Sequence, residues 1–471
     1  MMHMLHSGIM ATLQEPRKED LLYSTMSELG QLLRTHKLSC KELTLSYVDR
    51  IKQLDSKLNS FVTIMEEHAI QEAERVDREI QHGTDLGPLH GIPYAVKDLF
   101  ATKGVPTRWG SKIFSNQVFD YDATVVTRLR DAGAVLVGKL NMIELAGGTG
   151  YKFGSASATG ATHNPWDISR WAGGSSSGSG AAVAAGFVGF AMGSETWGSI
   201  VVPSAFCGIT GFRPSYGRVS RYGVMANSWT LDKVGPMARS AQDCMFVMNA
   251  INGVDPKDRT VHGSWRFTPR KKPARIGIFE QSPSDISKPV ADAIDVLRKV
   301  GHDVQEIKLP DLPYTEVTSV IQRSEACAAF WPIIRDGKLN ELSDEGLKTS
   351  FAAGVNIRAI DYLQANRVRA QIEDAAKDVM ARVDVIVAPT LPIIANKLEE
   401  DLDKAFGQIN EPLGPLGNLL GWPALSVPCG FSGGLPIGML VLGAYGQEDD
   451  VVSIGIDYQN STDWHKRRPP L

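Results

Sequence analysis

Apolar residues at helical spacing characterise the first part of the chain. Leu43, Tyr47 and Ile51 recur about every four residues, the interval that places side chains on one face of an α-helix. Ser39 precedes them and Glu42 stands three residues after it, which is the capping-box pattern of a helix N-terminus. We therefore predict two or three amphipathic helices between residues 24 and 80.

From residue 91 onward, short apolar runs alternate with helical segments. Predicted strands cover residues 91–96, 134–137, 187–192 and 275–278, and predicted helices cover residues 124–133 and 181–185. Residues 164–171 have the composition of a turn and loop. Strands that alternate with helices predict an α/β sandwich around a mostly buried sheet.

The predicted organisation has three parts. We expect a loosely held arm over residues 1–20, an N-terminal helical segment of the main domain over residues 21–80, and the core over residues 81–471. A charged, proline-containing stretch at residues 255–272 is a candidate subdomain boundary within that core. We find no internal repeat and no low-complexity tract long enough to be a linker.

Composition excludes several classes of protein. The 471 residues include 49 Lys and Arg against 53 Asp and Glu, a net charge of −4, which argues against a nucleic-acid or anionic-membrane binder. The longest run without strongly polar residues, 181–193, is shorter than the ~20 residues that span a bilayer. Five widely spaced cysteines without a CxxC pair favour reduced thiols, and with no secretory signal they predict a cytoplasmic location.

Three familiar motifs fail when their context is considered. Residues 133–139 have the spacing of a phosphate-binding loop, but Leu140 follows where a metal-binding Ser or Thr is required, and the run is typical of a buried strand. Residues 174–178 fit the GxSxG nucleophile elbow around Ser176, yet no apolar strand precedes them. The histidines that could complete such a triad, or bind a metal, stand alone in sequence: His163, His262, His302 and His465.

Two serine-bearing glycine loops and one lysine form a more promising set. Residues 173–180 are rich in Gly and Ser, a composition typical of a flexible linker, but an apolar helical segment follows at once and favours a loop pinned beside the core. A second glycine turn carries Ser199, and Lys97 ends an apolar strand. A buried lysine loses its proton more easily and can activate a serine, while consecutive N–H groups in a glycine turn can stabilise an oxyanion.

The order and spacing of these motifs resemble the amidase signature family from about residue 25 to the C-terminus. The matching segments are residues 91–98, 164–167, 173–179, 198–203, 206–214, 216–220, 235–239 and 464–469. The resemblance implies one α/β/α domain with a large mixed β-sheet covered by helices. It also implies an amidohydrolase of linear amides that needs no metal or organic cofactor.

The resemblance implies a role for each site residue. Ser199 would be the acyl-forming nucleophile, Ser175 the bridging serine that follows a cis peptide bond, and Lys97 the neutral base. The residues implied for the oxyanion hole are Thr196, Trp197, Gly198 and Ser199, and those implied for substrate binding are Gly147, Gly148, Thr149, Ser176 and Trp197.

The turn around Ser199 departs from the family's usual Asp-Thr-Gly-Gly-Ser-Ile-Arg. Glu195 replaces the Asp, Trp197 replaces a Gly, and Val201 replaces the Arg. The indole either forms a wall of the acyl pocket or fills a gap in the core. The first alternative predicts a hydrolase of apolar or aryl amides, with carbamates and esters as further candidates.

The leading hypothesis is a stand-alone amidase with a small-molecule amide substrate and no nucleic-acid or membrane partner. The alternative is the glutaminase subunit of a tRNA-dependent amidotransferase, which the same family contains. A binding protein without activity is disfavoured because all three catalytic positions are intact. The sequence leaves the oligomeric state open, a homodimer being one option.

Overall fold

One large mixed β-sheet organises the computed structural model, which describes residues 18–278, 287–407 and 411–471. Its 11 strands follow the order β1-β3-β2-β6-β8-β7-β12-β13-β11-β9-β10. Their bounds are β1 Phe61–Ile64, β2 Pro93–Lys97, β3 Val135–Leu140, β6 Phe190–Glu195, β7 Thr210–Arg213, β8 Lys233–Ala238, β9 Arg275–Ile278, β10 Asp303–Glu306, β11 Val385–Pro389, β12 Ala424–Ser432 and β13 Leu435–Gly443. The predicted α/β fold with a large mixed sheet is confirmed.

β2 and β6 are neighbours in the sheet, and the residues at their ends form part of the candidate active site. β2 runs parallel to both β3 and β6, and β6 runs antiparallel to β8. Parallel strands end at the same edge, so Lys97 at the end of β2 and Glu195 at the end of β6 lie at one edge of the sheet. Every residue of these two strands is buried.

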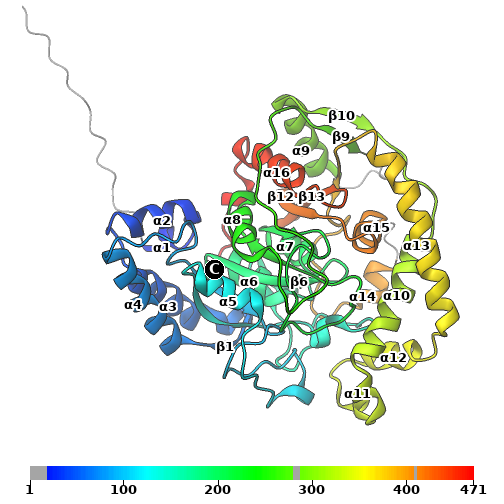
Figure 1. The fold of residues 1–471 in the computed structure, drawn as a ribbon, viewed down its shortest axis with the longest axis horizontal. Coiled ribbons are helices and arrows are strands. Elements are labelled where there is room, and N and C mark those ends of the chain that lie inside the picture. Colours follow the sequence, from blue (N-terminus) through cyan, green and yellow to red (C-terminus); the bar gives the residue numbers. More distant parts are fainter. Residues whose placement is uncertain (1–17, 279–286, 408–410) are drawn as a thin grey trace, which may run out of the picture.

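Helices cover both faces of the sheet (Figure 1). On β12, Leu425 packs against Gly455 of one helix and its neighbour Ser426 faces the opposite side, where Ala205 of another helix lies near. The helices are α1 Lys18–Leu21, α2 Met26–Arg34, α3 Cys40–Leu58, α4 Glu66–Gln81, α5 Thr124–Asp131, α6 Ser177–Ala184, α7 Val201–Cys207, α8 Ala241–Ile251, α9 Ser287–Val300, α10 Tyr314–Ala329, α11 Trp331–Arg335, α12 Glu345–Gly354, α13 Ala359–Met380, α14 Leu402–Phe406, α15 Leu413–Leu419 and α16 Glu448–Asn460.

The N-terminal segment confirms its predicted helices and adds one strand. Ser39 caps α3 through a capping box with Glu42, and Leu43, Tyr47 and Ile51 are buried along one face. The added strand β1 lies between α3 and α4 and pairs antiparallel with β3. A run of only four residues between two helices gives no periodicity by which a strand could be recognised.

Three segment boundaries near the site differ from the sequence predictions. Residues 164–171, predicted as turn and loop, belong to the hairpin of β4 His163–Asn164 and β5 Asp167–Trp171. The helix expected at residue 181 begins at Ser177, inside the glycine- and serine-rich segment. The strand expected over residues 187–192 covers Phe190–Glu195 instead. In each case tertiary packing overrides the weak local preference of Gly, Ser and Asp.

The C-terminal segment returns to the N-terminal helices. Arg468 forms an ion pair with Asp20 at 2.7 Å. Most of the predicted N-terminal arm, residues 1–17, lies outside the described residues.

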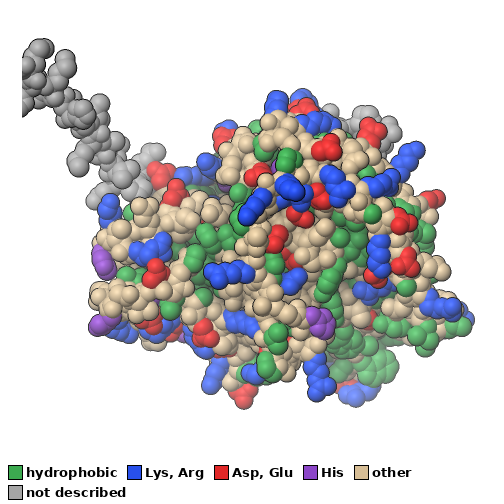
Figure 2. Space-filling view, turned by 45° about the horizontal axis from the view of Figure 1, so that its top comes forward, with side chains coloured by type: hydrophobic (Ala, Val, Ile, Leu, Met, Phe, Trp, Pro, Cys, Tyr) green, Lys and Arg blue, Asp and Glu red, His purple; other side chains and the backbone are tan. Residues whose placement is uncertain are grey.

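All five cysteines are free and buried, and within the described ranges no helix is long and apolar enough to cross a membrane. Acidic and basic side chains are mixed over the face shown in Figure 2.

Replacing Gly178 with Ala should lower the free energy of unfolding by about 1–3 kcal/mol, the usual cost of overpacking. An added Cβ would stand 2.4 Å from the Ser60 carbonyl oxygen and 2.6 Å from the Asn141 nitrogen, both backbone atoms. Gly30 in α2 is the control, because its Cβ would meet only the mobile end of Arg34, at 3.0 Å. Gly30→Ala should be neutral or stabilising. Urea denaturation measures both, and a Gly178→Ala protein of wild-type stability would contradict this account.

Candidate active site

Lys97 is fully buried at the carboxyl end of β2. Its Nζ donates to Ser175 Oγ at 2.7 Å and to Ser194 Oγ at 3.0 Å. The first of these serines precedes α6 and the second belongs to β6, so the amine joins two segments that are far apart from β2 in sequence. The predicted base and the predicted bridging serine are thus in direct contact.

Burial changes the protonation of this lysine. Desolvation lowers the pKa of Lys97 from its ordinary 10.5 to about 7, and the carboxylates of Asp232 and Glu195 oppose only part of that shift. A substantial fraction of the molecules therefore carries a neutral amine at this position at neutral pH. A neutral amine can accept a proton, whereas an exposed lysine at the same pH cannot.

Ser175 lies in a segment that is pinned rather than flexible. Residues 171–185 are all buried, and Ile143 N donates to the Ser175 carbonyl at 3.1 Å. The Gly174–Ser175 peptide bond is cis, as the family resemblance implies. Gly178 in this segment allows a close approach of the chain's own backbone, since an added Cβ would stand 2.4 Å from the Ser60 carbonyl oxygen.

Ser199 stands in the turn between β6 and α7. Gly198 has φ +81°, a left-handed conformation that glycine adopts without strain. The backbone N–H groups of residues 196–199 donate no hydrogen bond to any described residue. Three of these four residues are buried, and Trp197 is partly exposed. Unpaired N–H groups in a buried turn are available to a ligand oxygen.

The loops that carry Ser175 and Ser199 are joined by a backbone hydrogen bond and not by a bond between the two serine hydroxyls. Ser176 N donates to the Ser199 carbonyl at 3.3 Å, which holds the two loops together. Within the described part of the chain, no hydrogen bond joins Ser199 Oγ to Ser175 Oγ. Ser199 remains 8% exposed and lines a cavity.

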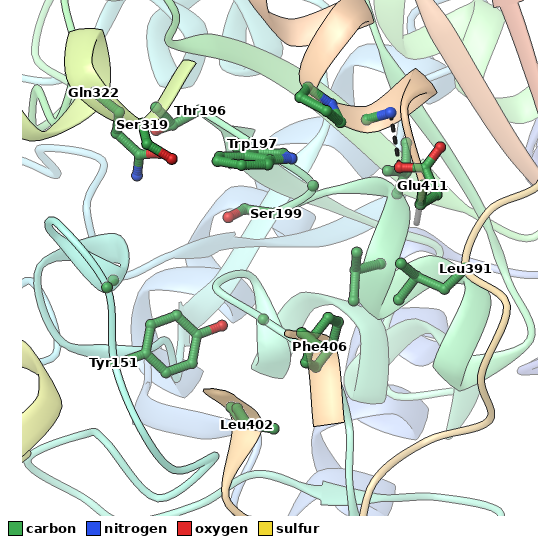
Figure 3. Close-up of a pocket in the computed structure, with 18 of the residues that line it drawn as sticks. Tyr151, Thr196, Trp197, Ser199, Ser319, Gln322, Leu391, Leu402, Phe406 and Glu411 are labelled. Carbon is green, nitrogen blue, oxygen red and sulfur yellow. Dashed lines mark hydrogen bonds between the residues drawn. The ribbon is translucent and has the colours of Figure 1, made fainter. Parts of the chain in front are cut away.

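That cavity has a volume of about 520 Å³. Figure 3 shows the Ser199 side chain between the Trp197 indole on one side and Tyr151 and Phe406 on the other. Leu391 and Leu402 extend the apolar wall. The cavity is large enough for a small aromatic molecule.

Polar groups occupy other parts of the same wall. Ser319 and Gln322 face the cavity from α10, and Glu411 accepts from Leu413 N and Gly414 N, each at 2.8 Å. Burial raises the pKa of Glu411 to about 7, although these backbone N–H groups favour its charged form. The cavity thus combines apolar bulk with a few fixed polar groups.

The predicted substrate-binding residues fall into two groups. Gly147, Thr149 and Trp197 line the cavity, whereas Gly148 and Ser176 do not contribute to its wall. The Ser176 hydroxyl donates instead to the Ser194 carbonyl at 3.2 Å. The Trp197 indole lies in the cavity wall and does not fill a gap in the core, which favours the first of the two alternatives for this residue.

Sequence reasoning missed most of the wall. Apart from Trp171, which ends β5 just before the glycine- and serine-rich segment, the missed residues are distant in sequence from the serine motifs, and none belongs to a recognisable pattern: Tyr151, Ser319, Gln322, Leu391, Leu402, Phe406 and Glu411. Ser319 and Gln322 come from α10 and Leu402 and Phe406 from α14, so only the folded chain brings them beside Ser199.

The rejected motifs find ordinary structural places. Residues 135–140 form the buried strand β3, where Lys139 Nζ donates to the Phe100 carbonyl at 2.6 Å. His262, His302 and His465 do not line the cavity that holds Ser199. Among the described residues, no group of three or more His, Cys, Asp or Glu side chains is arranged to hold a metal ion.

Comparison with known families decides the classification. A family model described as Amidase matches residues 42–452. The chain belongs to the amidase signature family. Its members hydrolyse C–N bonds, and an amide substrate follows from that membership.

Relatives of this family member carry two kinds of name. A glutamyl-tRNA(Gln) amidotransferase subunit from Synechococcus sp. (strain JA-3-3Ab) is 38% identical over 95% of this chain and 94% of its own. The peptide amidase from Stenotrophomonas maltophilia superposes with a TM-score of 0.83 at 29% identity, covering 95% of this chain and 98% of that one. The corresponding amidotransferase subunit from Thermotoga maritima gives 0.78 at 30% identity, covering 96% and 98%.

The reactivity of Ser199 in this amidase should depend on pH through Lys97. Labelling by a fluorophosphonate probe should accelerate as pH rises and level off above about 7, because Lys97 is protonated and inactive below that pKa. Lys97→Met should slow labelling by about 10²–10⁴ and abolish this limb. Intact-protein mass spectrometry at a series of pH values measures both.

His465→Ala is the control for the histidine-based alternative and should label at the wild-type rate. The opposite pattern, a slow His465→Ala and a fast Lys97→Met, would contradict the assignment of the base.

Proposed function

We propose that this amidase hydrolyses small amides with apolar or aryl groups through an acyl-enzyme on Ser199. The observation that carries the proposal is the cavity in which Ser199 faces an apolar wall next to unpaired backbone amides. Carbamates and esters are further candidate substrates, because the same attack on a carbonyl carbon cleaves them.

The acylation step uses the buried lysine and both serines. Neutral Lys97 takes the Ser175 proton as Ser175 takes the Ser199 proton, and Ser199 Oγ attacks the amide carbon. The carbonyl oxygen becomes an oxyanion that accepts from the turn amides of residues 196–199. The tetrahedral intermediate then loses its C–N bond, and the nitrogen leaves with a proton returned from Lys97 through Ser175.

Deacylation reverses these roles. A water molecule gives its proton towards Ser175 and Lys97, and its oxygen attacks the ester carbon. The ester C–O bond breaks, Ser199 recovers a proton, and the carboxylic acid departs. Catalysis requires Ser199 Oγ to rotate towards Ser175 Oγ, since the free protein lacks that hydrogen bond; catalytic contacts often tighten only when substrate binds.

The wall of the cavity supports apolar or aryl substrates. Trp197, Tyr151 and Phe406 border the space next to Ser199. Burial of an aromatic ring against such a wall contributes about 25 cal/mol per Å² of apolar surface. Val201, which stands where the family usually has Arg, adds another apolar side chain to this wall.

A second candidate is a glutaminase subunit of a tRNA-dependent amidotransferase. The names of curated relatives such as that from Synechococcus favour it. In that case the ammonia released from glutamine would pass to a partner protein, and the isolated chain would hydrolyse glutamine. The aromatic residue at position 197 favours the stand-alone amidase.

Trp197→Gly should lower kcat/KM for an acyl anilide about tenfold or more, because the substrate loses an aromatic wall. Activity on glutamine should change little, so the ratio of the two specificity constants should fall. Assays with the purified chain on both substrates measure this ratio. Ser199→Ala is the control for activity from contaminants and should lose about 10⁴–10⁶ of the rate.

A wild-type preference for glutamine would favour the second candidate instead. An anilide-to-glutamine ratio that does not change in Trp197→Gly would remove the basis for the aryl preference.

A further inference from the structure

Glu195 is a completely buried carboxylate four residues before Ser199. Its Oε2 accepts from Ile200 N at 2.9 Å and from Val201 N at 3.1 Å. These two amides come immediately after the nucleophile and begin α7. Glu195 precedes the turn in sequence, and its side chain binds the backbone of the two residues that follow Ser199. It therefore connects the start of the turn to its end.

The other carboxylate oxygen is anchored to a different strand. Glu195 Oε1 accepts from Arg213 Nη1 at 2.7 Å, and Arg213 Nε donates to the Trp422 carbonyl at 3.1 Å. Arg213 ends β7, which lies beyond β8 from β6 in the sheet. The pair thus ties the turn to rigid strands rather than to a loop.

The Glu195 carboxylate is ionised at neutral pH. Burial alone raises the pKa of Glu195, but Arg213, Lys233 and the Ile200 amide lower it to about 2, so the carboxylate is ionised throughout the neutral range. A buried charge is costly unless it is paired and hydrogen-bonded, and the Glu195 carboxylate meets both conditions. Removing either partner would leave the other charge uncompensated.

Two departures of the turn lie at this carboxylate and at one of the residues whose amide it binds. The family pattern has Asp at position 195 and Arg at position 201, whereas this chain has Glu and Val. Glu is one methylene longer than Asp, and its ion-pair partner is Arg213. Val201 supplies no charge, and the Glu195 carboxylate binds its backbone N–H instead.

We infer that Glu195, anchored by Arg213, is the positioning residue of the nucleophile turn. By binding the amides of residues 200 and 201, it fixes the path of the turn so that the amides of residues 196–199 stay unpaired and face the cavity. It does not touch the reacting atoms. The inference rests on the proposed role of Ser199.

The test follows labelling of Ser199 by a fluorophosphonate probe, which needs no knowledge of the natural substrate. Glu195→Gln should lower the maximal labelling rate about 10- to 100-fold, since small misplacements of reacting groups have effects of this size, and should leave the half-saturating probe concentration nearly unchanged. Glu195→Asp should show a similar loss.

The matched control is Glu448→Gln. Glu448 is also completely buried and bound to an arginine, with Arg218 Nε at 3.0 Å, but it does not line the cavity. This variant should lose thermal stability without slowing the labelling of Ser199. It separates the loss of a buried ion pair in general from the loss of the pair that positions the turn.

The outcomes distinguish the inference from the proposed function. Labelling of the wild type at a residue other than Ser199 would overturn both. A folded Glu195→Gln variant that labels at the wild-type rate would overturn the positioning role alone. If Glu195→Gln does not fold, Glu195→Asp, which keeps the charge, decides the question: labelling of that variant at the wild-type rate would overturn the positioning role.

Discussion

The exclusion of water from the Lys97 amine is the constraint on which the site depends. An amine in water keeps its proton at neutral pH, whereas burial at the end of β2 lowers the pKa of Lys97 to about 7. Its hydrogen bonds to Ser175 and Ser194 satisfy the amine without neutralising its charge by a direct ion pair. Dense packing of the sheet and of the glycine- and serine-rich segment is therefore part of the chemistry that we propose.

A second set of buried charges has the opposite design. Glu195 and Arg213 are both buried, but they neutralise each other and hold backbone amides in place. The site thus separates two tasks: the buried lysine can exchange a proton at neutral pH, while the neighbouring Glu195 carboxylate stays ionised and binds the backbone of the turn. Asp232, which hydrogen-bonds Thr196 at 2.6 Å, supports the same turn from the β8 side.

Much of the fold and the three central residues of the site could be predicted from the sequence. Capping at Ser39 and the apolar runs that became β2, β3, β6 and β9 have local signals, and Lys97, Ser175 and Ser199 stand in motifs with family spacing. The edge strand β1 and the hairpin β4–β5 lack such signals because their residues prefer turns or have too short a pattern. The wall residues Tyr151, Phe406 and Glu411 meet Ser199 only through long-range packing, which no local pattern encodes.

The most direct test of the account is the titration of Lys97 itself. NMR of protein with ¹³C-labelled lysine side chains, assigned by comparison with Lys97→Arg, reports the protonation of each amine from its Cε chemical shift. The account predicts an inflection for Lys97 near pH 7, well below the range of exposed lysines. An inflection at about 10, in the ordinary range of lysine, would contradict it.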